Sequence, residues 1–263
     1  MSHLWLPAAV SIVVTRSSLD CLQALLQRPA MASIAPALRD ALVCAWSELS
    51  AVQGEGVPWS LLGDTLDALA LLSADEPTLI AALLFDLPAL RGALADLPWQ
   101  PAQRRVAVEG LLDGLDAADQ VWALHAGREA GRNSEGLRRL LLSIIHDLRV
   151  VPILLARQLV RLRVADSLSE QQRRAMAQLT RDIHAPLANR LGIWQLKWEL
   201  EDLAFRPLEP DTYRRIAREV DETRLARERY VEQVKKALSR ELLAQGIEAE
   251  VSGRPKHIYS IWR

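Results

Sequence analysis

The chain has 263 residues, of which 50% are apolar and 25% are charged, so it is long enough to bury one large domain or one and a half ordinary ones. The net charge of −1 hides an asymmetry: residues 1–130 carry 7 Lys/Arg against 15 Asp/Glu, whereas residues 131–263 carry 25 against 18, which directs any polyanionic partner to the second half. Cys21 and Cys44 form no metal-ligand spacing and no disulfide framework, which excludes a disulfide-stabilised secreted domain and fits a reducing cytosol.

The first apolar run, Leu4–Val14, has no basic residue before it and contains Pro7, so it lacks the pattern of a signal peptide. It is also too short to span a bilayer. We interpret it as a first core element. Because no other run approaches membrane length, the sequence predicts a soluble, cytoplasmic chain that does not contact a membrane.

The next eighty residues are rich in Ala and Leu and are interrupted by six prolines, a pattern typical of short helices joined by tight corners. Within them, Thr78–Asp86 (TLIAALLFD) is apolar almost all round and predicts a central buried helix. Further helices are expected over residues 101–126, followed by an exposed loop at Gly127–Gly136.

From Leu137 to Leu148 apolar residues recur with helical spacing, which predicts a regular helix that continues over Val150–Arg163 after a kink at Pro152. Another amphipathic stretch follows, for which Ser169 is the expected N-cap.

The stretch His184–Arg206 (HAPLANRLGIWQLKWELEDLAFR) has many helix formers and few breakers. Its apolar residues recur at spacings that predict one buried side, with the acidic cluster Glu199, Glu201 and Asp202 in solvent. That side consists of Leu187, Leu191, Trp194, Trp198 and Leu203. Periodicity alone indicates a buried helix between two domains.

The rest of the chain changes its period near the end. Pro207 and Pro210 break the preceding helix, and Asp211–Leu243 predicts a long charged helix that Gly246 stops. The inward residues of that helix are expected to be Ile216, Val220, Val231, Val234, Leu238 and Leu242. Alternation of Ile247, Ala249 and Val251 with polar residues then predicts a strand, the beginning of a β-containing domain.

The tail GRPKHIYSIWR places Arg254 and Lys256 on either side of Pro255, between the expected strand and a short helix. Two cations and the first amides of a helix at one corner outline a phosphate site. A basic turn at the end of an edge strand is the alternative.

The strings APLANRLGI and WELEDLAF, together with this tail, resemble the RelA/SpoT homologues, which make and destroy the guanosine tetra- and pentaphosphate alarmones. The resemblance is strongest over residues 137–263. It implies a helical HD-type hydrolase-like domain over residues 1–195, then linking helices and the start of an α/β nucleotidyltransferase-like synthetase domain over residues 196–263. In that synthetase motif the residues matched by Arg254 and Lys256 contact ATP, and the helix that carries Ser260 packs beneath them.

The family transfers pyrophosphate from ATP to the 3′-hydroxyl of GTP or GDP with magnesium, and its remaining synthetase residues lie downstream of this motif. The resemblance therefore implies ATP, Mg²⁺ and GTP or GDP for a complete synthetase, and neither a cofactor nor a catalytic residue in this chain. Its other implied partner is the downstream synthetase domain itself. Contacts with the ribosome and tRNA belong to C-terminal domains outside this chain.

The family's hydrolase holds manganese with two histidines and two aspartates, beside a Glu-Asp pair that assists water. Here Phe85 stands in place of a ligand histidine beside Asp86, and Ala89 and Leu90 replace the assisting pair. Arg157 replaces a ligand acid and Arg161 a catalytic asparagine. The upstream ligand histidine is expected near Leu62 or Gly63, where neither residue can bind a metal.

His146-Asp147 spells the HD pair, but it falls where the family has an Asp-x-Arg that Asp147 and Arg149 match, so we expect helix-to-helix hydrogen bonding there. His125 and His184 lack spaced partners and are predicted to be structural. The former metal site is expected to be filled by side chains around Phe85, Leu84 and Leu90.

The sequence thus predicts a catalytically inactive, regulatory hydrolase-like region of an alarmone synthetase, closest to the RelA branch. Two alternatives come from other classes. One is an active manganese-dependent 3′-pyrophosphohydrolase with a different ligand set, which metal content would reveal. The other is a helical adaptor whose basic half binds RNA, which the salt dependence of RNA affinity would reveal.

Overall fold

The computed structural model describes residues 18–53, 57–125, 136, 139, 146–220 and 224–263, and this part of the chain is built from helices. The predicted core run at Leu4–Val14, the loop at Gly127–Gly136 and the helical stretch 137–145 lie outside the described residues, apart from the isolated positions 136 and 139. Among the described helices, none combines the length and the apolar character that crossing a membrane requires.

Helix α4 (Glu76–Asp86) is the centre of the fold, as its all-round apolar sequence predicts, because every residue from Glu76 to Leu84 is buried. Asp75 caps the helix by accepting a hydrogen bond from the Thr78 amide at 3.1 Å, and Pro77 occupies the first turn, where no amide hydrogen is needed. The one buried carboxylate of α4, Glu76, accepts from Arg104 Nη1 at 2.7 Å and from the Ala35 amide at 3.3 Å.

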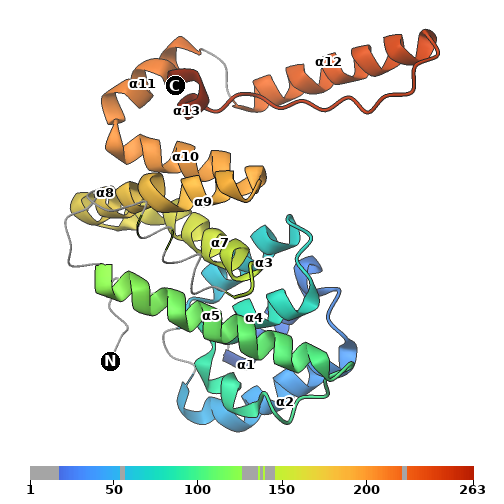
Figure 1. Ribbon diagram of the computed structural model, residues 1–263, viewed down its shortest axis with the longest axis vertical. Helices are drawn as coiled ribbons and strands as arrows, with labels where there is room; N and C mark the ends of the chain where they lie inside the picture. Colours follow the sequence, from blue (N-terminus) through green and yellow to red (C-terminus); the bar gives the residue numbers. More distant parts are fainter. Residues whose placement is uncertain (1–17, 54–56, 126–135, 137–138, 140–145, 221–223) are drawn as a thin grey trace.

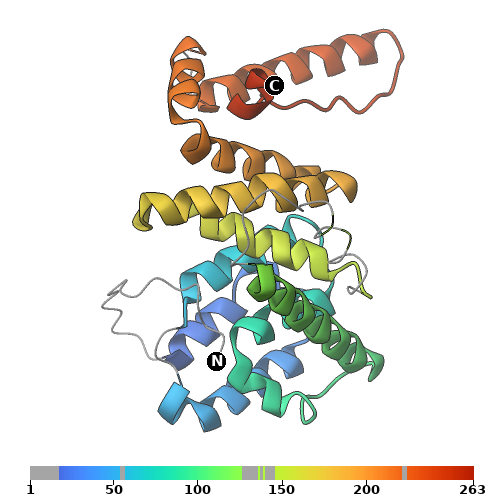
Figure 2. The same ribbon diagram turned by 60° about the vertical axis from the view of Figure 1, so that its left-hand side comes forward.

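The first part of the chain surrounds α4 with short helices that turn at prolines, as the sequence predicts. Its elements are α1 (Ser18–Leu26), η1 (Pro29–Met31), α2 (Pro36–Gln53), α3 (Trp59–Ala70), η2 (Pro88–Ala93) and α5 (Gln103–His125). Helices α3, α5 and α7 (Val150–Arg163) all pack against α4. Figures 1 and 2 show α7 crossing above this group, so its buried face joins the lower core to the upper helices.

The upper layers follow in chain order: η3 (Ala165–Ser167), α8 (Glu170–Leu179), the π-helical turn η4 (Thr180–His184), α9 (Ala185–Arg190) and α10 (Trp194–Leu208). Ser169 caps α8 through a capping box with Gln172, as predicted. At η4 the Thr180 hydroxyl donates to the Met176 carbonyl and accepts from Gln158 Nε2 of α7, both at 2.8 Å. This turn places His184 in the interior, where burial lowers the pKa of its imidazole to about 4.

Two predicted helices are interrupted in the structure. The expected continuation of a helix through residues 146–149 is wrong, because these residues form a turn before α7 begins at Val150, and Pro152 lies in its first turn. Likewise the predicted single helix over 184–206 divides at Gly192, whose φ of +70° suits a residue without a side chain. Trp194 therefore begins a new helix and is 52% exposed, instead of continuing the buried side.

Beyond α10 the single helix predicted over Asp211–Leu243 is also divided: α11 (Pro210–Glu219) ends before the turn at Val220, α12 (Arg224–Ala244) is a separate helix, and α13 (Ile258–Trp262) follows. Helix α12 stops at Gly246, with φ of +74°, as predicted. However, none of its residues from Ala226 to Ala244 is buried, so the predicted inward face has no core to pack on among the described residues. The division of the chain at residue 195 stays a prediction, because α10 packs both on α8 and on α13.

Residues 247–251 do not form the predicted strand. The segment after Gly246 runs back alongside α12 in both views (Figures 1 and 2), and a Cβ on Gly253 would lie 3.3 Å from Val231 Cγ1. A strand needs a neighbouring strand to satisfy its backbone groups, and no described residue provides one.

Candidate functional site

The positions expected to hold a metal lie together where the end of α4 meets α7, and a salt bridge occupies them. Arg157 Nη2 of α7 lies 2.5 Å from Asp86 Oδ1 at the end of α4, and the two side chains are only 12% and 18% exposed. The Arg157 guanidinium carbon also lies 4.3 Å from the centre of the Phe85 ring. A cation and an aromatic ring therefore lie at the two positions where the sequence resemblance leads us to expect a ligand acid and a ligand histidine.

A second arginine closes the same site from η2. Arg91 donates to both carboxylate oxygens of Asp116 on α5, at 2.8 and 3.2 Å, and its guanidinium carbon lies 5.2 Å from the Phe85 ring centre. Its Nε donates to the Leu84 carbonyl at 3.3 Å. Phe85 thus lies in contact with two cations, each held by a carboxylate from a different helix.

The expected apolar filling of this site is only partly confirmed. Leu84 and Leu90 are fully buried, and Ala89 packs against the core, so the two positions of the assisting Glu-Asp pair hold no polar side chain. Phe85 itself is only partly buried, and the Arg157 guanidinium covers its ring. The site is closed by ion pairs over an aromatic ring and is not a simple extension of the apolar core.

Arg161, at the position where the resemblance leads us to expect a catalytic asparagine, lies one turn after Arg157 on α7. Removal of water around its guanidinium and the charge of Arg157 lower its pKa, while Asp86 and Asp119 act in the opposite direction. At Asp119 removal of water raises the pKa of the carboxyl, and Arg157 and Arg161 oppose that rise. Arg161 and Asp119 are both exposed residues, so solvent screens the interaction of their charges with Arg157 and Asp86.

The upstream ligand position is also filled by an arginine. Leu62 and Gly63 are buried on α3, and a Cβ on Gly63 would collide with Arg28 Nη1, only 1.3 Å away. Arg28 bridges Asp64 at 3.4 Å and Asp67 at 3.1 Å on the same helix. A histidine at residue 63 would have to displace this guanidinium.

These residues do not fit a manganese ion. A divalent cation needs several carboxylate or imidazole donors at one point, whereas here Asp86 faces a guanidinium and the neighbouring positions are aromatic, apolar or cationic. No group of three His, Cys, Asp or Glu side chains with metal-binding geometry occurs in the described ranges. Sequence comparison of Phe85, Arg157 and Arg161 pointed to this site, but Arg28 and Arg91 give no sequence signal because their partners are distant along the chain.

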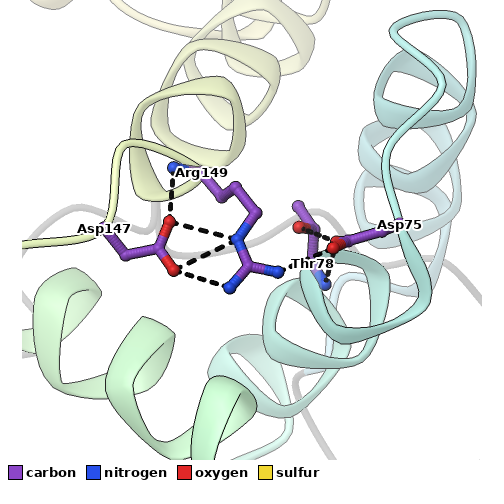
Figure 3. Close-up of polar contacts among 4 residues, drawn as sticks. All are labelled: Asp75, Thr78, Asp147 and Arg149. Carbon is purple, nitrogen blue, oxygen red and sulfur yellow. Dashed lines mark hydrogen bonds and ion pairs between the residues drawn. The ribbon is translucent and has the colours of Figure 1, made fainter. Parts of the chain in front are cut away.

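The Asp-x-Arg pattern forms a second polar cluster, which joins the first turn of α4 to the residues before α7 (Figure 3). Arg149 donates to Asp147 through Nε and Nη2 at 3.1 and 2.6 Å, and its Nη1 lies 2.6 Å from Asp75 Oδ2. Asp75 also accepts from the amide and hydroxyl of Thr78. Asp147 is therefore engaged by an arginine, as the hydrogen-bonding interpretation predicts.

The charges of this second cluster are mutually stabilised. Hydrogen bonds from Arg149 lower the pKa of the Asp147 carboxyl. For Asp75, burial raises the pKa, but hydrogen bonds from Thr78 and Arg149 outweigh it and lower the pKa below its ordinary value. The pKa of Arg149 is correspondingly raised. His146 is exposed beside this cluster.

The predicted ATP corner lies at the other end of the molecule. Arg254 and Lys256 are exposed, and Ser260 is partly buried on α13, which packs on α10 and α11. The Arg254 guanidinium carbon lies 3.1 Å from the centre of the Trp198 ring on α10. The Lys256 carbonyl accepts from Arg227 Nη1 at 3.0 Å.

One amide of the predicted phosphate corner already has a partner within the chain. The Tyr259 amide in the first turn of α13 donates to Asp202 Oδ1 at 3.0 Å, so this helix-start amide already has a carboxylate partner. A pocket of about 340 Å³ lies beside Lys256, and its other lining residues include Tyr213, Arg227 and His257.

Comparison with known proteins places these features in a family. A family model described as "HD domain" matches residues 44–194. The chain is 43% identical to a GTP pyrophosphokinase of Escherichia coli (strain K12) over 202 residues. This aligned segment covers 76% of this chain and 27% of that protein. A GTP pyrophosphokinase of Photobacterium angustum is 41% identical over 220 residues, or 82% of this chain and 29% of its own.

A third relative has a different name. A probable guanosine-3′,5′-bis(diphosphate) 3′-pyrophosphohydrolase of Synechocystis sp. is 50% identical over 130 residues, which cover 49% of this chain and 17% of that protein. The chain therefore spans less than a third of the length of each of these relatives.

Proposed function

The chain belongs to the HD domain family and is homologous to the GTP pyrophosphokinases of the RelA/SpoT type, and from this premise we propose that it is the N-terminal region of an enzyme of guanosine tetra- and pentaphosphate metabolism. Its helical bundle corresponds to the hydrolase-like domain, and residues 196–263 correspond to the link and the first part of a synthetase domain.

We further propose that the hydrolase-like domain performs no hydrolysis. The observation that carries this proposal is the salt bridge between Arg157 and Asp86 over the Phe85 ring. Hydrolysis of a 3′-pyrophosphate in this family needs a manganese ion to polarise the phosphoryl group and generate a nucleophilic water. A guanidinium at the ligand position repels such an ion, and Ala89 and Leu90 carry no group that moves a proton.

Manganese binding and hydrolysis test this proposal together. The chain is incubated with excess Mn²⁺, freed of unbound metal and analysed for metal content, and it is then assayed for pyrophosphate release from guanosine tetraphosphate. The Synechocystis relative, treated in parallel, is the positive control. We expect neither stoichiometric manganese nor pyrophosphate release from this chain. One equivalent of bound manganese together with turnover would establish the active hydrolase, the alternative that the name of the Synechocystis relative favours.

The synthetase function requires residues that follow the ATP corner. We propose that a protein that continues this chain through a complete synthetase domain transfers pyrophosphate from ATP to GTP or GDP with Mg²⁺, and that Arg254 and Lys256 bind the ATP. The two exposed side chains are two residues apart in the sequence, and Arg254 has no hydrogen-bond or ion-pair partner among the described residues. They remain available to an anionic ligand.

The test uses the longer protein and measures guanosine tetraphosphate formed from ATP and GDP. Arg254→Ala and Lys256→Ala should each reduce turnover at limiting ATP at least about tenfold, or roughly 1.4 kcal/mol of transition-state stabilisation, with little change in melting temperature. Lys236→Ala, which removes a cation from α12, is the matched control. Full activity in both Arg254→Ala and Lys256→Ala would reduce the corner to a basic turn.

A further inference from the structure

Helix α10 presents different residues to the two ends of the molecule. Leu196, Leu200 and Ala204 are buried. Trp198, Asp202 and Phe205 recur at i, i+4 and i+7, so they share another face of the helix. Each residue of this second face contacts the C-terminal tail.

Trp198 holds Arg254 by stacking. The guanidinium carbon lies 3.1 Å from the ring centre, and the His257 ring lies on the same tryptophan at 6.5 Å with an interplanar angle of 25°. Stacking engages the face of a guanidinium and leaves its N–H donors at the edge. Contact with the ring removes water from Arg254 and lowers its pKa, an effect that Glu201 opposes.

Asp202 and Phe205 fix the helix that follows. Asp202 Oδ1 accepts from the Tyr259 amide at 3.0 Å. The Phe205 ring lies 5.6 Å from the ring of Tyr259 and 4.8 Å from that of Trp262. These contacts hold both ends of α13, so the tail is anchored on α10 before and after Lys256.

The same helix is tied to the bundle beneath it. Arg163 at the end of α7 donates to both oxygens of Glu199 at 2.7 and 2.8 Å, which is the paired geometry that fixes an arginine in orientation. Glu199 was expected to be solvated, yet it forms this interhelical pair. Through α10 the Arg254 side chain is therefore placed relative to the hydrolase-like domain.

We propose that Trp198 is a positioning residue for ATP binding: its ring orients the Arg254 guanidinium so that the N–H edge is presented to the nucleotide. Trp198 does not touch the nucleotide and acts through Arg254. This inference rests on the proposed ATP role of Arg254. It assigns to the linking helix α10, which packs on the hydrolase-like bundle, the task of holding one wall of the ATP site.

The test measures KM for ATP and kcat separately in the longer protein. Trp198→Leu, which removes the aromatic face, should raise KM for ATP at least about fivefold, and Trp198→Phe, which keeps an aromatic face, should restore most of the affinity. Trp99→Leu, the same substitution at a partly buried site far along the chain, is the control and should leave KM unchanged. The KM for GDP should be the same in all of these proteins.

Arg254→Lys is a second route to the answer because the exposed position tolerates it without loss of folding. Lysine keeps the charge but lacks the planar group that stacks. Arg254→Lys should raise KM for ATP when Trp198 is present, and it should cause no further increase in the Trp198→Leu variant. Non-additivity of this kind indicates that the two side chains act as a unit.

The possible failures are distinguishable. If Arg254→Ala does not change KM for ATP, the proposed ATP role of Arg254 is wrong and the inference falls with it. If Arg254→Ala raises KM but Trp198→Leu does not, or if the effects of Trp198→Leu and Arg254→Lys simply add, the ATP role stands and the positioning role of Trp198 is refuted.

Discussion

Replacement of Arg157 by methionine tests the physical basis of the closed hydrolase site. Methionine keeps most of the aliphatic volume and removes the charge, so Asp86 would lose its partner while it stays largely covered. Two unit charges about 4 Å apart attract by about 4 kcal/mol at an effective dielectric constant of about 20. Desolvation of both groups offsets much of this attraction, but removal of one partner leaves the other uncompensated.

We expect Arg157→Met to lower the free energy of unfolding by about 2 to 4 kcal/mol, with about 1 kcal/mol of that from the lost contact with Phe85. Urea unfolding followed by circular dichroism at 222 nm measures it. Arg105→Met, which removes an i,i+4 pair with Glu109 on α5 whose side chains are 42% and 44% exposed, should cost less than about 0.5 kcal/mol. The double variant Arg157→Met/Asp86→Asn should recover part of the loss, because no charge is then left without its partner.

The reasoning fails if Arg157→Met costs no more than Arg105→Met. In that case the salt bridge would contribute nothing to closing the site, and the absence of a metal site would have to rest on the ligand positions alone.

Three further expectations concern stability. His184 has a pKa of about 4 in the folded chain against an ordinary 6.5, so the unfolded state takes up a proton first as the pH falls. The free energy of unfolding should therefore drop between pH 6.5 and 4, by about 2 kcal/mol at pH 5. In His184→Gln, compared with wild type by urea unfolding at pH 7.5 and 5, this pH dependence should be lost. Equal pH dependence in both proteins would mean that the imidazole is not buried. Arg149→Met should lower the free energy of unfolding by only about 1 kcal/mol at pH 7, because its carboxylate partners are partly exposed. The difference from wild type should shrink below about pH 4, because Asp75 and Asp147, whose pKa values are lowered in the folded chain, then take up protons. Phe85→Ala should cost about 1 to 2 kcal/mol by thermal unfolding, less than a fully buried phenylalanine, and a loss above about 3 kcal/mol would indicate a ring packed in the core.

Several elements could be predicted because local sequence determines them. The helix at Thr78–Asp86 is apolar on every side, and such a segment is stable only when it is surrounded by other helices. Ser169 begins a helix because its hydroxyl and the Gln172 side chain satisfy the free amides of the first turn. Gly246 ends a helix because it adopts positive φ.

Other features depend on contacts between distant parts of the chain, which no local pattern reveals. The apolar spacing from Leu187 to Leu203 runs through Gly192 without interruption, so the break there is invisible to periodicity. The residues Phe85 and Arg157 could be singled out through family resemblance. Only the packing of α4 against α7 shows that Arg157 pairs with Asp86 and covers the Phe85 ring. The stack of Arg254 on Trp198 has no sequence signature, because the residues around Arg254 do not indicate which distant side chain it contacts.

The uneven distribution of buried side chains predicts an uneven pattern of amide hydrogen exchange. The apolar core is continuous from α1 to α10, so the amides of α4 and α7 can exchange only when most of that core opens. From Ala226 to its end α12 buries no side chain, and an isolated helix of about twenty residues is marginally stable in water. Its amides should therefore exchange by local opening while the bundle stays protected. Slower exchange in α12 on addition of a partner domain would map the surface that the domain covers.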